Sequence, residues 1–150
     1  IGFILYLFQD KFFLHPQPLP YGYQYKFDYP FKEINIEINK DENLNLVQFF
    51  PADSLRKGVV LYFHGNMTNI NRYANFAANF TKKGYEVWMI DYPGFGKTTG
   101  MLTEKKLYME AMLFYKLANT HFGKDSIIIY GRSFGTGQSC KLASAIDCKR

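Results

Sequence analysis

The stretch "SIIIYGRSFGTGQSCKLASAI", residues 126–146, decides the fold. An apolar run leads into a serine crowded by glycines, and a helical pattern follows. Within it, GRSFG (131–135) fits the G-x-S-x-G pattern, which puts a serine on a tight strand-to-helix turn so that its hydroxyl projects into a cleft. We expect Gly131 and Gly135 to remove side chains that would collide there. The stretch predicts a nucleophile elbow at Ser133; the alternative is a glycine-rich turn that only packs a helix against a sheet.

Upstream of this stretch, apolar runs alternate with helical patterns. The runs are "VVLYF" (59–63) and "YEVWMI" (85–90), and the helical patterns cover 70–80 and 107–118. Continuous apolar runs are typical of strands buried on both faces. Gly84 and Gly123 are expected to stop the two helices, and Thr103 to cap the second. Strands that alternate with helices in this way indicate a parallel sheet with helices on its faces.

A hairpin is expected before the first buried run. Ile34, Ile36 and Ile38 alternate with polar residues, as in a half-buried strand, and a second strand follows the turn "NKDEN" (39–43). The predicted fold is therefore a three-layer α/β fold, in which an N-terminal β-hairpin precedes parallel βαβαβα.

The loop after the first buried run supplies what a serine nucleophile requires. Ligands of such sheets bind at the carboxyl ends of the strands, and acyl transfer needs two N–H donors for the developing oxyanion. We expect these donors to be the amides of Phe134 and Asn66, with Gly65 permitting the turn. His64 could serve as a catalytic base, but a histidine placed before this glycine is better interpreted as a support for the oxyanion turn.

The loop "GFGKTTG" (94–100) looks like a phosphate-binding loop. The G-x-x-x-x-G-K-[ST] pattern requires a glycine five residues before Gly96, and Asp91 stands there. We favour a glycine-rich loop that shapes the mouth of the cleft over a nucleotide site.

Composition narrows the possible partners. The 150 residues carry 18 basic and 13 acidic side chains, a net charge of +5, and the basic residues form no stripe. Nucleic acid is therefore not an expected partner. The two cysteines, Cys140 and Cys148, have no metal-ligand spacing. We expect no metal site, no cofactor and no disulfide framework.

The N-terminal part divides from the rest at about residue 33. Residues 1–33 hold an apolar run, "IGFILYLF" (1–8), and a lead-in rich in proline and aromatic residues; residues 34–150 hold the α/β part. Eight residues cannot cross a bilayer, which needs about 20. The run is either the end of a longer membrane anchor or a helix that packs on the body. The expected location is accordingly membrane-associated through the N-terminus, or cytoplasmic.

Three segments together resemble a known family. "YFHGN" (62–66), "GYEVWMIDYPGFGKTTG" (84–100) and "IIIYGRSFGTG" (127–137) are similar to the N-terminal half of an α/β-hydrolase of the serine aminopeptidase-like (hydrolase-4) branch, which includes membrane-anchored members. The resemblance implies that Ser133 is the nucleophile, that Asn66 and Phe134 form the oxyanion hole, and that the substrate is an ester, thioester or peptide, either a small molecule or an acylated protein.

The chain departs from the family pattern in two places. Pro93 stands where the loop usually has arginine, and after Ser133 the chain offers Asp147 but no histidine. The superfamily orders its triad Ser, Asp, His. We therefore expect a truncated chain that lacks its triad Asp and His and is inactive alone. The competing interpretation is a non-catalytic binding protein that kept the cleft.

Overall fold

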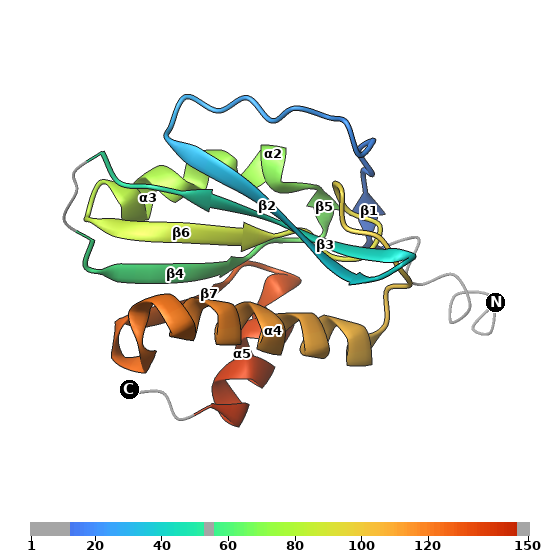
Figure 1. Ribbon diagram of the computed structural model, residues 1–150. Helices are drawn as coiled ribbons and strands as arrows, with labels where there is room; N and C mark the ends of the chain where they lie inside the picture. The colour runs from blue at the N-terminus through green and yellow to red at the C-terminus, as the bar shows by residue number, and fades with distance from the viewer. Residues whose placement is uncertain (1–12, 53–55, 147–150) are drawn as a thin grey trace.

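A five-stranded mixed sheet organises the computed structural model, which describes residues 13–52 and 56–146 (Figure 1). Its strand order is β2-β3-β6-β4-β7. The strands are β2 (Phe31–Asn39), β3 (Glu42–Phe49), β4 (Gly58–Phe63), β6 (Tyr85–Ile90) and β7 (Ile127–Gly131). β2 and β3 form the antiparallel hairpin, β3 runs antiparallel to β6, and β4 pairs in parallel with both β6 and β7. The predicted hairpin and parallel core are both confirmed.

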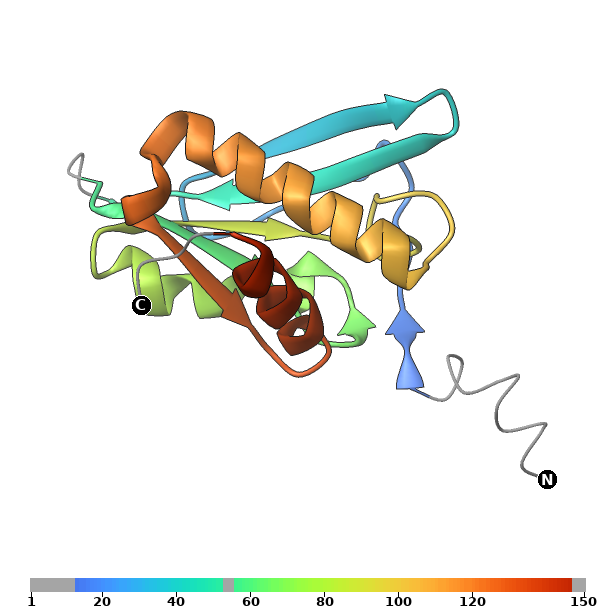
Figure 2. The same ribbon diagram turned by 90° about the horizontal axis from the view of Figure 1, so that it is seen from below.

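Helices cover both faces of this sheet, which gives the predicted three layers. α2 (Ile70–Tyr73), a 3₁₀ segment (Ala74–Ala77) and α3 (Ala78–Thr81) lie on one face; α4 (Glu104–Phe122) and α5 (Gly135–Ala145) lie on the other (Figures 1 and 2). The central strand β4 serves both layers. Its residues Val59, Leu61 and Phe63 pack toward α4, and Val60 and Tyr62 pack toward α2. This two-sided burial explains its unbroken apolar sequence.

The predicted ends of the long helix are confirmed. The Thr103 hydroxyl accepts a hydrogen bond from the Lys106 amide at 3.2 Å, and Gly123 follows the last turn with φ of 67°. The other predicted helix, over 70–80, is not continuous, because a 3₁₀ segment interrupts it. The buried small residues of this segment, Ala74 and Ala77, allow its backbone to lie close to the sheet.

The lead-in is extended, as expected, but it is also part of the fold. β1 (His15–Pro16) pairs in parallel with β5 (Met67–Thr68) in the loop after β4. The Leu19 amide donates to the Gly96 carbonyl at 2.7 Å. A ladder of aromatic rings then crosses the α2 face; it consists of Tyr23, Tyr25, Phe27 and Phe31. The lead-in thereby closes one side of the sheet's carboxyl edge.

Some sequence predictions fall outside the described residues, namely the apolar run 1–8, Asp147 and Cys148. Among the residues that are described, no helix has both the length and the apolar character needed to cross a membrane.

Candidate active site

Ser133 lies on the predicted strand-to-helix turn, between β7 and α5. Its φ is 52°, in the left-handed region that a non-glycine residue rarely adopts. The two flanking glycines have no room for a side chain. A Cβ at Gly131 would lie 2.2 Å from Ser139 Oγ, and one at Gly135 would lie 2.1 Å from the Phe63 carbonyl oxygen. The close approach of α5 to β4 and β7 thus forces the strained turn that exposes the serine.

The loop after β4 comes close to this serine. A Cβ added at Gly65 would lie 3.6 Å from Ser133 Cβ and only 2.7 Å from the Tyr73 hydroxyl, so the loop has room only for glycine at this position. Asn66, Ser133 and Phe134 line one cavity of about 280 Å³. Within the described part of the chain, no hydrogen bond uses the amide of Asn66 or of Phe134 as donor. The assignment of these two amides to an oxyanion hole stays a prediction.

His64 is fully buried beside this loop. Its Nδ1 lies 2.7 Å from the Gly65 carbonyl oxygen and its Nε2 lies 3.1 Å from Asp91 Oδ1. The ring stacks on Tyr73 at a centroid distance of 4.9 Å. Both ring nitrogens are engaged by the protein and the ring has no exposed surface, which is the placement that a supporting role requires.

Asp91 joins the two ends of the same loop. Its Oδ1 accepts a hydrogen bond from the Ile70 amide at 3.0 Å, besides the contact with His64, and its Oδ2 accepts one from the Tyr25 hydroxyl at 3.3 Å. Asp91 has no exposed surface. Burial, followed by the charge of Asp91, raises the pKa of the Tyr25 hydroxyl well above its ordinary value. The phenol therefore stays protonated and donates to the carboxylate.

The polar network continues from Tyr25 to the loop that resembles a phosphate-binding loop. Asn45 Oδ1 accepts from the Tyr25 hydroxyl at 3.1 Å, and Asn45 Nδ2 donates to Glu33 Oε1 at 2.7 Å. Lys97 Nζ donates to the same Glu33 oxygen at 2.7 Å, and only 4% of Lys97 is exposed. The buried lysine is committed to an ion pair with the partly exposed Glu33, which favours the structural interpretation of this loop over a nucleotide site.

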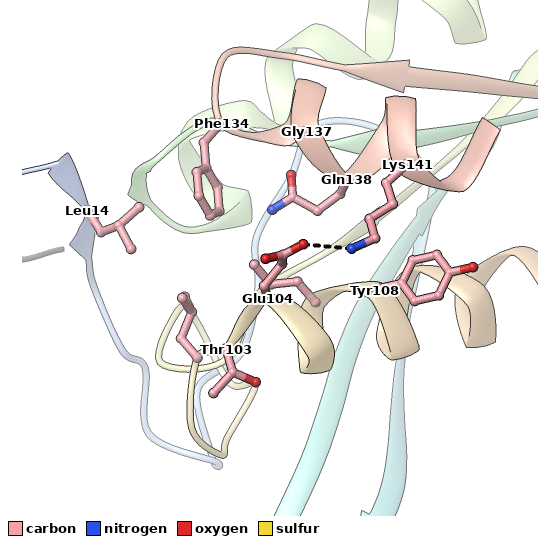
Figure 3. A pocket seen from close by; sticks show the side chains of 10 residues that line it. Leu14, Thr103, Glu104, Tyr108, Phe134, Gly137, Gln138 and Lys141 are labelled. Carbon is pink, nitrogen blue, oxygen red and sulfur yellow. Dashed lines mark hydrogen bonds and ion pairs between the residues drawn. The ribbon is translucent and has the colours of Figure 1, made fainter. Parts of the chain in front are cut away.

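A larger cavity of about 520 Å³ lies next to the serine cavity. Leu14 and Phe134 line both of them. The remaining lining residues are Leu102, Thr103, Glu104, Leu107, Tyr108, Gly137, Gln138 and Lys141 (Figure 3). Sequence reasoning missed this cavity, because its walls come from three separate segments. The only local signal was the second glycine of "GTG", Gly137.

Among the described residues, no group of three or more His, Cys, Asp or Glu side chains is arranged to hold a metal ion. Cys140 is a free, exposed thiol on α5.

Comparison with known proteins shows what the chain as a whole is similar to. Residues 54–149 match the family described as serine aminopeptidase, S33 (Hydrolase_4). The alpha/beta hydrolase domain-containing protein aho-3 of Caenorhabditis elegans is 35% identical over 91 residues, which cover 59% of this chain and 27% of that protein. The alpha/beta hydrolase domain-containing protein 17C of Xenopus tropicalis is 32% identical over 92 residues, covering 59% and 30%. The chain thus spans less than a third of the length of these curated relatives.

Solved structures share the fold. An esterase from Pyrococcus furiosus superposes with a TM-score of 0.64 at 19% identity, covering 89% of this chain and 52% of that one. A soluble variant of the monoglyceride lipase of Saccharomyces cerevisiae gives a TM-score of 0.63 at 19% identity, covering 79% and 41%.

Proposed function

This chain belongs to the serine aminopeptidase S33 family of α/β-hydrolases, and from that premise we propose that it carries the nucleophile half of a serine hydrolase site. The reaction is cleavage of an ester, thioester or peptide acyl bond. One observation carries the proposal: Ser133, held at φ of 52° by a glycine-crowded turn, opens into the same cavity as Asn66 and Phe134.

The mechanism follows from this arrangement. The Ser133 hydroxyl attacks the carbonyl carbon, and the amides of Asn66 and Phe134 donate to the oxygen as it becomes negative. Collapse of this adduct breaks the bond to the alcohol, thiol or amine, which leaves with the proton taken from the serine, and water then releases the acyl group from Ser133. A base must remove the serine proton, because a hydroxyl is a weak nucleophile at its free pKa. His64 is fully buried and both of its ring nitrogens contact other groups of the protein, so we assign the base and its orienting carboxylate to a longer parent protein.

The proposed substrate is a small molecule or an acylated protein. The N-terminus is proposed to contribute membrane association.

The decisive experiment compares the 150-residue chain with its parent on p-nitrophenyl butyrate. The parent is expected to turn over, and Ser133→Ala to lower its rate by about 10⁴ to 10⁶. Ser144→Ala, which removes a hydroxyl from an exposed site on the same helix, is the matched control and should keep the parent's rate. The 150-residue chain alone should hydrolyse the ester very poorly.

Two outcomes would contradict the proposal. If the 150-residue chain turns over at the parent's rate and His64→Ala abolishes this activity, then His64 is the base. If the parent is inactive and has no Asp and His after Ser133, the chain is a binding protein that kept the cleft.

A further inference from the structure

A cavity of about 460 Å³ opens between the end of α4 and the strands β2, β3 and β6. Figure 2 shows why the sheet is accessible there: the β2–β3 hairpin extends beyond α4 on the side away from α5. Ser133 follows the carboxyl end of β7, whereas this cavity includes Glu86 near the start of β6. The two sites therefore lie at opposite ends of the parallel strands. The volume is within the range of small-molecule sites.

The register of three neighbouring strands builds the floor of this cavity. Lys32 on β2 lies opposite Gln48 on β3, and Gln48 lies opposite Trp88 on β6. Side chains that lie opposite each other on adjacent strands point to the same face of a sheet. Trp88 packs in the cluster beneath α4. The ammonium, the amide and the indole thus form one row on the α4 face.

Aromatic rings form much of the cavity wall. Trp88 and Phe122 meet edge to face, with their ring centroids 5.9 Å apart. Phe50 contributes a third ring, and Leu117 on α4 adds an aliphatic surface. Aromatic rings gain from edge-to-face and offset contacts with one another. A small aromatic body therefore suits this wall.

The charged side chains around the cavity do not cancel. Glu86 is 2% exposed, and its carboxylate binds Arg56 and accepts a hydrogen bond from Trp88 Nε1 at 2.7 Å. The charge of Arg56 is balanced by this pair. Lys32 is exposed and has no ion-pair partner among the residues that the structure describes. One positive charge at the rim is left over, which favours a ligand with a single negative charge.

Gln48 is the polar group of the floor. The residue is 7% exposed, and its amide makes no hydrogen bond within the described part of the chain. Its oxygen and nitrogen are nevertheless not sealed in the interior, unlike Gln138 Oε1. Buried amides normally have a partner, and an amide N–H can donate to a carboxylate. Gln48 thus offers a donor beside the unpaired ammonium of Lys32.

We propose that this cavity binds a small aromatic monocarboxylate. The aromatic body lies against Trp88 and Phe122, and the carboxylate accepts hydrogen bonds from Lys32 Nζ and the Gln48 amide. The inference goes beyond the proposed hydrolase and does not depend on it, because none of these residues lines the cavity of Ser133.

Three probes with the same body test the proposal on the 150-residue chain. They are 3-phenylpropanoate, 3-phenylpropanol and 3-phenylpropylammonium, which differ in charge. Trp88 is the only tryptophan, so its indole N–H gives a single NMR signal that reports on the cavity. All affinities are read from the saturable shift of this signal. The carboxylate should bind about fivefold more tightly than the alcohol, as expected for one exposed ion pair, and the ammonium should bind most weakly.

Lys32→Gln should remove the preference for the carboxylate over the alcohol. Lys40→Gln is the matched control, since it removes the same charge from the exposed turn of the same hairpin, outside the cavity. It should keep the preference. Gln48→Met, which is similar in volume and lacks the amide, should weaken the carboxylate about fivefold. Lys32 is exposed, so the Lys32→Gln test stands even if the variant at the buried position 48 does not fold.

Four outcomes would overturn the proposal. An indole signal that does not respond to 3-phenylpropanoate removes the site, and equal affinities for the three probes remove the carboxylate as its ligand. Equal losses in Lys32→Gln and Lys40→Gln would mean that the net charge of the chain, and not the cavity, attracts the anion. A folded Gln48→Met variant with wild-type affinity for the carboxylate would remove the amide from the site.

Discussion

Two polar regions lie at the carboxyl ends of the parallel strands, one around Asp91 and one at the start of α5. They differ in how many of their polar groups are hydrogen-bonded within the protein. Around Asp91, buried polar side chains bind one another: His64 and Tyr25 contact the carboxylate, and Lys97 pairs with Glu33. Around α5, the exposed Ser133 sits at a strained φ and Gln138 keeps a buried oxygen without a partner in the described structure. Hydrogen-bonded polar groups stabilise the loops around Asp91, whereas the exposed hydroxyl of Ser133 is open to a ligand.

One glycine from each region shows a difference in packing. A Cβ at Gly96 would lie 1.9 Å from Asp91 Oδ2, whereas one at Gly137 would meet nothing within 4 Å. There is no spare volume at Gly96, whereas α5 is open at Gly137, although Gly131 and Gly135 at the start of the same turn are packed as closely as Gly96. Substitutions should therefore be costly for folding in the first region and matter mainly for ligands in the second.

The largest effect is expected from Asp91→Ala. It leaves the Ile70 amide, the His64 ring and the Tyr25 hydroxyl without their shared acceptor. Removing one partner of a buried charged network costs about 3–5 kcal/mol, which urea denaturation of the 150-residue chain would measure. Asp28→Ala, at an exposed aspartate, should stay within about 0.5 kcal/mol of wild type. Equal stability of the two variants would mean that the network does not hold the loop.

Much of α4 and of the turn into α5 could be predicted from sequence, because the signals there are local. The turn at Ser133, the cap at Thr103 and the stop at Gly123 each depend on a few adjacent residues. The interruption of the helix over 70–81 could not be predicted from the sequence. The 3₁₀ segment follows from how the chain packs on the sheet, and no local sequence pattern indicates it.

The Asp91 network could not be predicted either, because its members come from distant segments. Tyr25 is 66 residues from Asp91, and Lys97 is 64 residues from Glu33. Read locally, the lysine after Gly96 looked like part of a phosphate-binding loop. Only the fold shows that this lysine pairs with the carboxylate of Glu33.

Glu110 on α4 is a third case: it is buried, lacks a hydrogen bond in the described structure and lines none of the described cavities. It is 4% exposed on α4, and neither carboxylate oxygen has a hydrogen-bond partner in the described structure. Burial raises the pKa of Glu110 from 4.5 to about 7; the Lys106 ammonium, 3.9 Å away, opposes the shift, and Glu42 adds to it. The native state thus holds its proton more tightly than the unfolded chain. Stability from this carboxyl is full below pH 4.5 and is lost as the pH rises to 7.

Glu110→Gln should therefore stabilise the fold at pH 8, by up to about 3 kcal/mol for a shift of this size. At pH 4 it should change little. Thermal melts at both pH values measure this difference. Glu104→Gln is the control on the same helix: its hydrogen bond to Lys141 lowers the pKa of Glu104, so its removal should give no gain at pH 8. A Glu110→Gln gain that is equal at both pH values would show that titration is not its cause.

The smallest effect is expected at the serine itself, from Ser133→Gly. A non-glycine residue at φ of 52° carries a backbone cost of about 1–2 kcal/mol, which glycine relieves. Glycine also adds freedom to the unfolded chain, so the net gain over Ser133→Ala should be about 0.5–1 kcal/mol. Thr68→Gly, at φ of 57° outside the serine cavity, measures the same relief at a position with no proposed chemistry. If Ser133→Gly proves less stable than Ser133→Ala, the turn is not strained. If Ser133→Gly proves more stable than Ser133→Ala, the serine at this turn lowers the stability of the fold. The proposed role of its hydroxyl as the nucleophile explains why a serine is kept there.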